Sequence, residues 1–393
     1  MAGRSDWSTW IGEARSADPL VVAQALGVTL KKAGVEWVGP CPACGGTDRF
    51  AINTRKRVFN CRGAEGGDTI AMVEHITGCA FIEAVEQITG STRPDRSRDE
   101  KPEERAARLK RNAERNLANT RLAEENRKAE QARARADEQA VHEVLARAVP
   151  IAGTHAEAYM REGRGLTPSE RLTRDLRFVA DLDYWGAGDN GSGKLIKLAV
   201  LPALIAVIRA FDGSIIGISQ TYLDPKLPKK WIPVGSSHNS AKKIRGDKRG
   251  GMIRLGRMEE TMAIAEGWEN ALAWHQLGHA LSVENLGLGA AVDLGNLSGR
   301  SLGTVAHKWL KTPEGKRKLI SNGRPDPSSP GIIIPEGVKS LILLGDSNSE
   351  GLATAQQMVT AVRRFLDHGL EVSVHWAPWG MDWNEQLQLE ARA

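Results

Sequence analysis

Acidic and amide side chains follow a short apolar run near the C-terminus of this 393-residue chain, and their spacing suits metal chemistry. Leu341 to Leu344 are four consecutive apolar residues, which predict a buried strand of a parallel sheet. Asp346, Asn348 and Glu350 come shortly after this run. Open α/β sheets bind ligands at the carboxyl ends of their strands, and hard cations such as Mg²⁺ prefer oxygen ligands. The stretch therefore predicts a cation site.

Two other stretches repeat the arrangement of a short strand followed by a carboxylate. Residues 261–265 are predicted to form a strand that ends at Glu266, with a helix over 268–277. Residues 371–376 are a third predicted strand, and Asp382 lies in the segment that follows. If the three strands share one sheet, their ends bring the three carboxylates to one cation.

These motifs together resemble the Toprim domain, which bacterial-type DNA primases, topoisomerases and some nucleases share. The motifs read Glu266-Gly267, Asp346-Ser347-Asn348 and Gly380-Met381-Asp382. The resemblance is strongest to Toprim DNA primases of phages, plasmids and integrated elements. It implies an α/β Toprim domain, a parallel sheet flanked by helices, preceded by a mixed α+β subdomain and a small zinc-ribbon-like module. It also implies that Mg²⁺ or Mn²⁺ is held by four residues: Glu266, Asp346, Asn348 and Asp382.

The activity implied by this resemblance is metal-dependent nucleotidyl transfer, in which short primers are made from nucleoside triphosphates on single-stranded DNA. The cations would activate the attacking 3′-hydroxyl and neutralise the leaving pyrophosphate. Glu266 would bind a cation or act as a general acid–base. Asn348 stands where the family has a second aspartate, so the site has one negative charge fewer and lower cation affinity is expected. Glu350 is positioned to compensate.

Other functions remain open at this point. A Toprim nuclease would use the same carboxylates with water as the nucleophile. A catalytically degenerate nucleic-acid-binding protein is favoured by Asn348 together with Ala64, since both substitutions weaken a metal site. A topoisomerase would need a catalytic tyrosine in a further domain, and no such domain fits the three tyrosines of the chain.

Three closely spaced cysteines near the N-terminus predict a zinc site. Cys41 and Cys44 form a C-x₂-C knuckle, and Cys61 ends an alternating strand. Two thiolates on one tight turn suit a tetrahedral Zn²⁺ ion. The arrangement resembles the zinc-binding domain of bacterial-type primases, but Ala64 takes the position of the fourth ligand. Two further candidates on or beyond the next helix are poorly placed: His75 and Cys79. The alternative is a ribbon without metal, whose thiols pack as small apolar groups.

A segment rich in cations follows two strands predicted over 195–211 and 214–223, which a hairpin turn at Asp212-Gly213 joins. It is interpreted as a basic loop of the subdomain that precedes Toprim in primases, and such a loop attracts phosphates by counterion release. A solvated surface loop is the alternative. The candidate nucleic-acid-binding residues are Lys242, Lys243, Arg245, Lys248, Arg249 and Arg254.

The chain is predicted to have four segments: a zinc-ribbon-like module over 1–92, a charged helical or flexible linker over 93–140, the basic subdomain over 141–256 and the Toprim domain over 257–393. A stretch rich in Gly, Pro and Lys over 298–337 is interpreted as an insertion of unknown purpose. The run GDNGSGK over 188–194 has part of the spacing of a phosphate-binding loop. It lacks the Ser or Thr that would bind Mg²⁺ and precedes a strand, so a Gly-rich turn is expected.

Composition agrees with this interpretation. The net charge of +5 is a mild basic bias that is compatible with nucleic acid, and 41% hydrophobic residues allow a sizeable core. Grouped cysteines favour a metal site in a reducing compartment over a disulfide scaffold. With neither a membrane span nor a signal-peptide core in the sequence, a cytoplasmic protein is expected. A separate replicative helicase would be a further partner of a primase that lacks its own ATP-binding loop.

Overall fold

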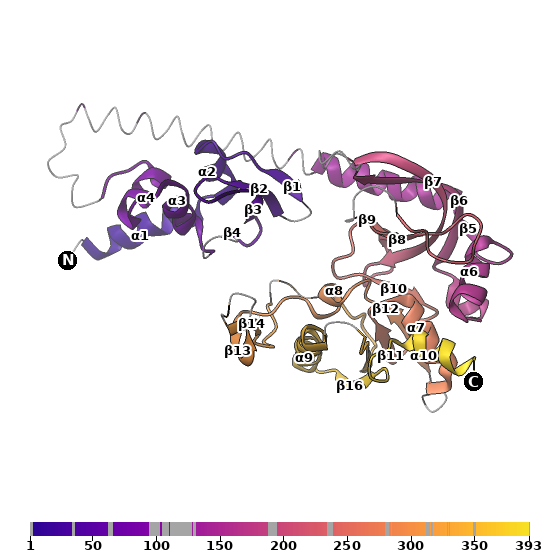
Figure 1. Ribbon diagram of the computed structural model, residues 1–393. Coiled ribbons are helices and arrows are strands. Elements are labelled where there is room, and N and C mark those ends of the chain that lie inside the picture. Colours follow the sequence, from indigo (N-terminus) through magenta and orange to yellow (C-terminus); the bar gives the residue numbers. More distant parts are fainter. Residues whose placement is uncertain are drawn as a thin grey trace. The chain divides into compact units, whose positions relative to one another are not determined.

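The chain forms two compact units, Met1–Arg133 and Ala134–Ala393 (Figure 1). The computed structural model describes residues 3–33, 36–61, 66–93, 103, 110, 128, 131–187, 195–233, 239–279, 283, 285–311, 315, 317–327, 329, 331–348 and 351–392. Most of the charged segment over 93–140, the run at 188–194 and Glu350 lie outside these residues; a helix is present over 131–147. Among the described helices, none combines the length and apolarity needed to cross a bilayer.

In the first unit, helices pack against a four-stranded antiparallel sheet in the order β1-β2-β3-β4. The carboxylates of Asp18 and Asp68 cap α2 and α3 by accepting hydrogen bonds from first-turn amides. Phe50 and Phe59 of the sheet pack against Ile70 and other apolar residues of the helices. The helices are α1 (Gly3–Ser16), α2 (Pro19–Ala25), α3 (Thr69–Thr77) and α4 (Phe81–Thr89). The strands are β1 (Lys31–Ala33), β2 (Glu36–Cys41), β3 (Gly45–Asn53) and β4 (Val58–Cys61).

A ten-stranded mixed sheet runs through the second unit. Its main path has the order β16-β15-β11-β12-β10-β7-β6-β5, and β8 and β9 are added at β7. The antiparallel strands are β5 (Val149–Pro150), β6 (Leu176–Ala187), β7 (Leu195–Arg209), β8 (Ile215–Tyr222), β9 (Lys242–Gly246) and β10 (Met252–Leu255). The parallel strands are β11 (Thr261–Ala265), β12 (Leu286–Ala290), β15 (Ser340–Gly345) and β16 (Glu371–Trp376). Since β10 pairs with both β7 and β12, one sheet contains the predicted basic subdomain and the predicted parallel strands.

Helices cover both faces of the parallel strands, which explains why these strands are apolar on both sides. Ala263 and Ala265 of β11 share a core with helices α7 (Trp268–Trp274) and α10 (Trp383–Glu390). Met262 and Ile264 point to the opposite face, where they share a core with α8 (Leu294–Ser298) and α9 (Gly351–Asp367). β11 and β15 pair in parallel with Ala265 opposite Leu344, so the two strands end side by side.

The cation-rich segment that was predicted as a loop contains strands. Lys242, Lys243 and Arg245 lie on β9, which pairs with β8, and Arg254 lies on β10. The hairpin turn predicted at Asp212-Gly213 is present, with Gly213 at a φ of 88° that favours glycine. The elements that complete the unit are α6 (His155–Arg164), η2 (Glu170–Thr173), η3 (His275–His279), β13 (Thr304–Lys311) and β14 (Arg317–Ser321).

Candidate active site and metal centre

Three carboxylates lie in the segments that follow the parallel strands, two of them within electrostatic range of the third, Asp346. Glu266 follows β11 and Asp346 follows β15, while Asp382 comes after β16 and caps the N-terminus of α10. Burial and the negative charges of Asp382 and Glu266, in that order of size, raise the pKa of Asp346 to about 7. Two of the carboxylates that sequence spacing singled out, Asp382 and Glu266, therefore act electrostatically on the third, Asp346.

The position of Asp346 is fixed by an amide that sequence reasoning missed. Asn270 of α7 donates hydrogen bonds from Nδ2 to both carboxylate oxygens of Asp346, at 2.9 and 2.8 Å. The amide oxygen of Asn270 in turn accepts from the backbone amide of Asn384 at 3.2 Å. Asn270 thus connects the end of β15 to the first turn of α10. Its place in the first turn of the helix that follows Glu266 is the signal that could have identified it.

Asn348 lies at the edge of this group and contacts a fourth carboxylate. Its Nδ2 donates to Oε2 of Glu385 at 2.8 Å. The same oxygen accepts from the backbone amide of Asp382, and Asp382 accepts from the amide of Glu385, both at 2.8 Å. This is a capping box, and its negative charge also raises the pKa of Asp346. The D-x-x-E spacing from Asp382 to Glu385 was a visible sequence signal that was not used.

Glu266 lies within electrostatic range of Asp293, the residue that precedes α8. Burial raises the pKa of Glu266, and the charge of Asp293 adds to the increase, while Lys242 opposes it. Asp293 caps α8 and forms an ion pair with Lys248. Lys242 and Lys248 are thus the two predicted basic residues that act directly on acidic groups of this region.

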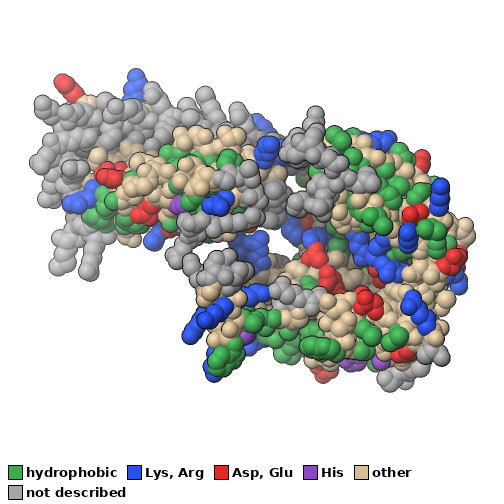
Figure 2. All heavy atoms as spheres, viewed as in Figure 1, with side chains coloured by type: hydrophobic (Ala, Val, Ile, Leu, Met, Phe, Trp, Pro, Cys, Tyr) green, Lys and Arg blue, Asp and Glu red, His purple; other side chains and the backbone are tan. Residues whose placement is uncertain are grey.

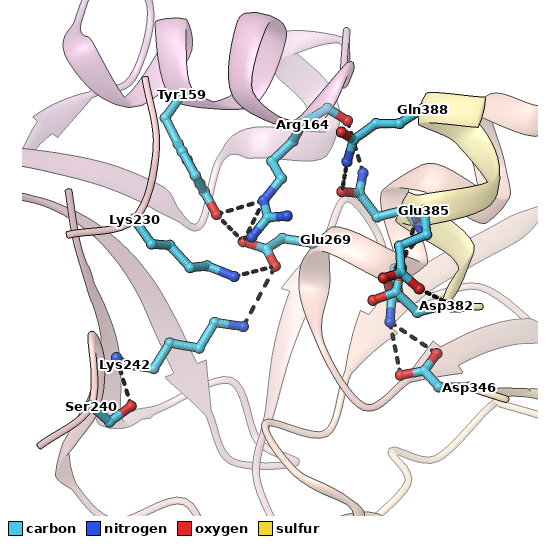
Figure 3. Close-up of polar contacts among 12 residues, drawn as sticks. Tyr159, Arg164, Lys230, Ser240, Lys242, Glu269, Asp346, Asp382, Glu385 and Gln388 are labelled. Carbon is cyan, nitrogen blue, oxygen red and sulfur yellow. Dashed lines mark hydrogen bonds and ion pairs between the residues drawn. The ribbon is translucent and has the colours of Figure 1, made fainter. Parts of the chain in front are cut away.

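A buried carboxylate beside this group is surrounded by cations. Glu269 of α7 accepts from the hydroxyl of Tyr159 at 2.5 Å and from Nζ of Lys230 at 2.9 Å. Nζ of Lys242 and Nε of Arg164 lie 3.6 and 3.7 Å from its oxygens (Figure 3). Burial alone would raise the pKa of Glu269, but the three cations outweigh it and lower the pKa to about 2. Burial lowers the pKa of Lys230 to about 8.

We call Glu269 and its four partners the Glu269 cluster: Tyr159, Arg164, Lys230 and Lys242. One carboxylate faces three cations there, so the cluster leaves positive charge beside the strand-end carboxylates. Figure 2 shows acidic side chains next to Lys and Arg side chains on this unit. Sequence reasoning had identified only Lys242 of this set as functional.

The other four predicted basic residues interact with groups other than the strand-end carboxylates. Lys243 donates to the backbone oxygen of Trp185, and its Nζ lies 4.3 Å from the ring centroid of Tyr184. Arg249 pairs with Asp247 two residues earlier. Arg254 donates to the backbone oxygens of the turn after β7, at 2.6 and 2.9 Å. The charge of Arg245 acts on the buried hydroxyl of Tyr222. The candidate basic residues are therefore distributed over several local environments.

The first unit contains a candidate zinc centre with three cysteines and one histidine. Cys41 ends β2, Cys44 follows on the turn, Cys61 ends β4, and His75 projects from α3. The four ligand atoms all lie within 4.8 Å of one another. Nε2 of His75 is 3.1 Å from Sγ of Cys41 and 3.7 Å from Sγ of Cys44. Cys₃His is a ligand set that structural Zn²⁺ sites use, so the residues fit the ion.

The prediction that His75 is poorly placed was wrong. α3 packs so that the imidazole stacks on Phe59, with ring centroids 5.6 Å apart, and its Nε2 faces the thiols. The backbone amide of Cys44 also donates to Sγ of Cys41 at 3.3 Å, an interaction that stabilises a thiolate. The ligand that Ala64 does not supply thus comes from the helix after β4.

Two family models match parts of the chain. Residues 16–104 match the family described as CHC2 zinc finger, and residues 135–255 match a domain of unknown function (DUF7146). A curated DNA primase from Halalkalibacterium halodurans is 38% identical over 76 residues. That alignment covers 19% of this chain and only 12% of the relative's length. The zinc finger match agrees with the Cys₃His centre.

Solved structures of primases are similar to the chain at low identity. The zinc-binding and RNA polymerase domains of the Aquifex aeolicus primase align with a TM-score of 0.34 and 15% identity, covering 98% of this chain and 83% of that chain. A DNA primase domain from Pseudomonas aeruginosa aligns with a TM-score of 0.35 and 14% identity, covering 64% of this chain and 74% of that chain.

Proposed function

We propose that the chain is a DNA primase that makes short primers on single-stranded DNA by metal-dependent nucleotidyl transfer, and that its second unit contains a Toprim domain. The observation that carries the proposal is the convergence of Glu266, Asp346 and Asp382 at the ends of parallel strands. Its setting is a chain with a zinc finger segment and a short match to a DNA primase. Replication of a mobile element is the biological setting we propose.

The donors are of the oxygen type that a divalent cation prefers. Asp346 is buried among other carboxylates that raise its pKa, and a divalent ion would remove that repulsion. Glu266, Asp346 and Asp382 would hold Mg²⁺ or Mn²⁺, with Asn348 and Glu385 at the edge of the site. A bound ion would lower the pKa of the attacking 3′-hydroxyl and neutralise charge on the leaving pyrophosphate. Asn270 keeps the Asp346 carboxylate in one orientation.

The Glu269 cluster supplies the other part of the proposed site. Its cations exceed its single carboxylate, so phosphates of nucleoside triphosphates or of the template would be attracted beside the metal. Glu269 holds Lys230 and Lys242 in fixed positions, which avoids the entropy cost of ordering them when a phosphate arrives. Lys242 acts on both Glu266 and Glu269, so it would connect the two parts.

The test uses the full chain with single-stranded DNA, labelled nucleotides and Mg²⁺ or Mn²⁺, and reads primer synthesis and template cleavage in the same reaction. Labelled primers that require the divalent ion and disappear in Asp346→Asn would support the proposal. The matched control is Asp367→Asn, which alters an exposed carboxylate at the end of α9 and should leave synthesis unchanged. Cleaved template without primers would replace the primase by a nuclease that uses the same carboxylates. DNA binding with neither product would indicate a degenerate site.

A further inference from the structure

An exposed β-hairpin lies within the segment first interpreted as an insertion. Strands β13 and β14 pair with each other in a sheet of their own, and β14 lies against α9. The sequence from 300 to 324 contains seven Lys or Arg residues and a single Glu. Figure 2 shows hydrophobic and basic side chains together over this hairpin. The proposed function assigns it no role.

The base of the hairpin is fixed to the second unit by a buried arginine. Arg364 of α9 is only 4% exposed. It donates from Nε to the backbone oxygen of Ser298 at 2.8 Å and from Nη2 to that of Arg300 at 3.2 Å, both on the incoming segment. It also donates to the backbone oxygen of Asp326 on the outgoing segment at 3.3 Å. One side chain thus holds the two segments that lead into and out of the hairpin.

The outer part of the hairpin presents an aromatic ring to solvent. Trp309 is 74% exposed, and no described side chain of β13 is buried. The pairing register shifts between Ala306 and Lys311, which is a bulge in the ladder. Within it, Nδ1 of His307 accepts from the backbone amides of Trp309 and Leu310, at 3.1 and 2.8 Å. The bulge therefore has a defined shape.

The composition of this surface selects one kind of occupant. Nζ of Lys308 lies 4.8 Å from the ring centroid of Trp309, so a cation already sits beside an exposed aromatic face. Unpaired bases stack on such rings, and the neighbouring cations attract the phosphates between those bases. In a duplex the bases stack on each other, so the ring has no base face to receive. The excess of positive charge is complementary to a polyanion and not to a neutral apolar partner surface.

We propose that the β13–β14 hairpin is a second nucleic-acid contact, which binds single-stranded DNA by stacking a base on Trp309 and by ion pairing with Lys308, Lys311 and Arg317. The site is separate from the carboxylates at the strand ends and needs neither a nucleotide nor a divalent ion. The proposal rests on the proposed function only in taking DNA as the strand that is bound.

The test measures equilibrium binding of the full chain to a fluorescein-labelled oligo(dT), without nucleotides and without added divalent ions. Trp309→Ala should weaken binding roughly 5- to 140-fold, the range for loss of one base-stacking contact. Trp309→Phe should retain most of the affinity because a ring remains. The triple change of Lys308, Lys311 and Arg317 to Gln should reduce the slope of log K against log salt by about 2.

Two further variants separate stacking from general damage. Val305→Ala removes an exposed apolar side chain of the same strand but no ring, so it should bind oligo(dT) as the wild type does. A variant in which residues 304–321 are replaced by an Asn-Gly turn joins two positions that already pair, since Asn322 donates to the backbone oxygen of Gly303 at 3.0 Å. This variant should keep the melting temperature and lose both the stacking and the charge contributions.

Because binding is measured without catalysis, an inactive enzyme would not affect the result. Wild-type affinity and salt slope in Trp309→Ala, the triple variant and the shortened variant would overturn the proposal. Equal losses on single-stranded and duplex DNA for Trp309→Ala would also overturn it, since stacking requires an unpaired base. If the hairpin bound only a protein, all three variants would keep the wild-type affinity for oligo(dT) and the wild-type salt slope.

Discussion

Neutralising Glu269 is the substitution whose effect the structure defines most closely. The Glu269→Gln variant keeps the size of the side chain and an oxygen to accept from Tyr159, but it leaves Lys230, Lys242 and Arg164 without their shared carboxylate. Lys230 is the most affected, because burial already lowers its pKa to about 8 with Glu269 in place. We expect the second unit to remain folded and to be clearly less stable.

The magnitude follows from the pKa of Glu269. The cations lower it from an ordinary 4.5 to about 2, and one pKa unit equals about 1.4 kcal/mol, so the charged form contributes about 3 kcal/mol at neutral pH. Removal of one partner from a buried ion pair typically costs about 3–5 kcal/mol, which agrees. Since the folded-state pKa is the lower one, this stability is present above pH 4.5 and is lost as the pH falls from about 4.5 towards 2.

Denaturant unfolding followed by tryptophan fluorescence measures this effect, because eight of the eleven tryptophans lie beyond residue 133. The free energy of unfolding of Glu269→Gln should be about 3 kcal/mol below that of the wild type at pH 7, and the difference should shrink below pH 4.5. Glu157→Gln is the matched control, since its carboxylate pairs with Arg161 at the surface and little change is expected. A variant as stable as the wild type at pH 7, or a difference that does not depend on pH, would refute the reasoning.

Three further predictions address the other sites. Purified protein should contain about one zinc ion per chain by metal analysis, and His75→Ala should release it to a chelator much faster than Cys79→Ala, whose thiol is outside the centre; metal-free folded wild type would contradict this. Asn348→Asp should lower the Mg²⁺ concentration that gives half-maximal primer synthesis, since it adds a negative charge beside Glu385 and Asp382; a titration that superimposes on the wild type would place position 348 away from the ion. Replacing Lys242, Lys243 and Arg245 together by Ala should weaken binding of single-stranded DNA and flatten its salt dependence. An unchanged salt slope would place the DNA on another surface.

The strand ends were predictable because hydrophobicity and spacing are local properties of the sequence. The run at 341–344 lies within β15, and the expected strand at 261–265 is β11 with the same bounds. Parallel pairing then brings Glu266 and Asp346 to neighbouring positions without further information. Local hydrophobicity does not settle the fate of every side chain nearby, since Trp383 packs in the core whereas Trp379, four residues earlier, is 96% exposed.

The missed residues depend on packing that the sequence does not display. His75 reaches the thiols only because α3 packs across β4, which brings its imidazole back over Phe59. Glu269 looked like an ordinary helical acid, and its partners come from segments more than 25 residues away in the chain. The hairpin over 304–321 was missed because no described side chain of β13 is buried, so β13 lacks the alternation that identifies a strand.

The continuity of the ten-stranded sheet has a consequence for how the protein can be divided. The family match over 135–255 ends at the last residue of β10, which pairs with β12 as well as with β7. A fragment that ends after β10 would expose the edge of β10 that pairs with β12, and such an unpaired edge promotes aggregation. The remaining fragment would lose the neighbour of β12 in the same way. We therefore expect domain exchange or truncation to succeed near residue 133 and to yield aggregated protein near residue 256.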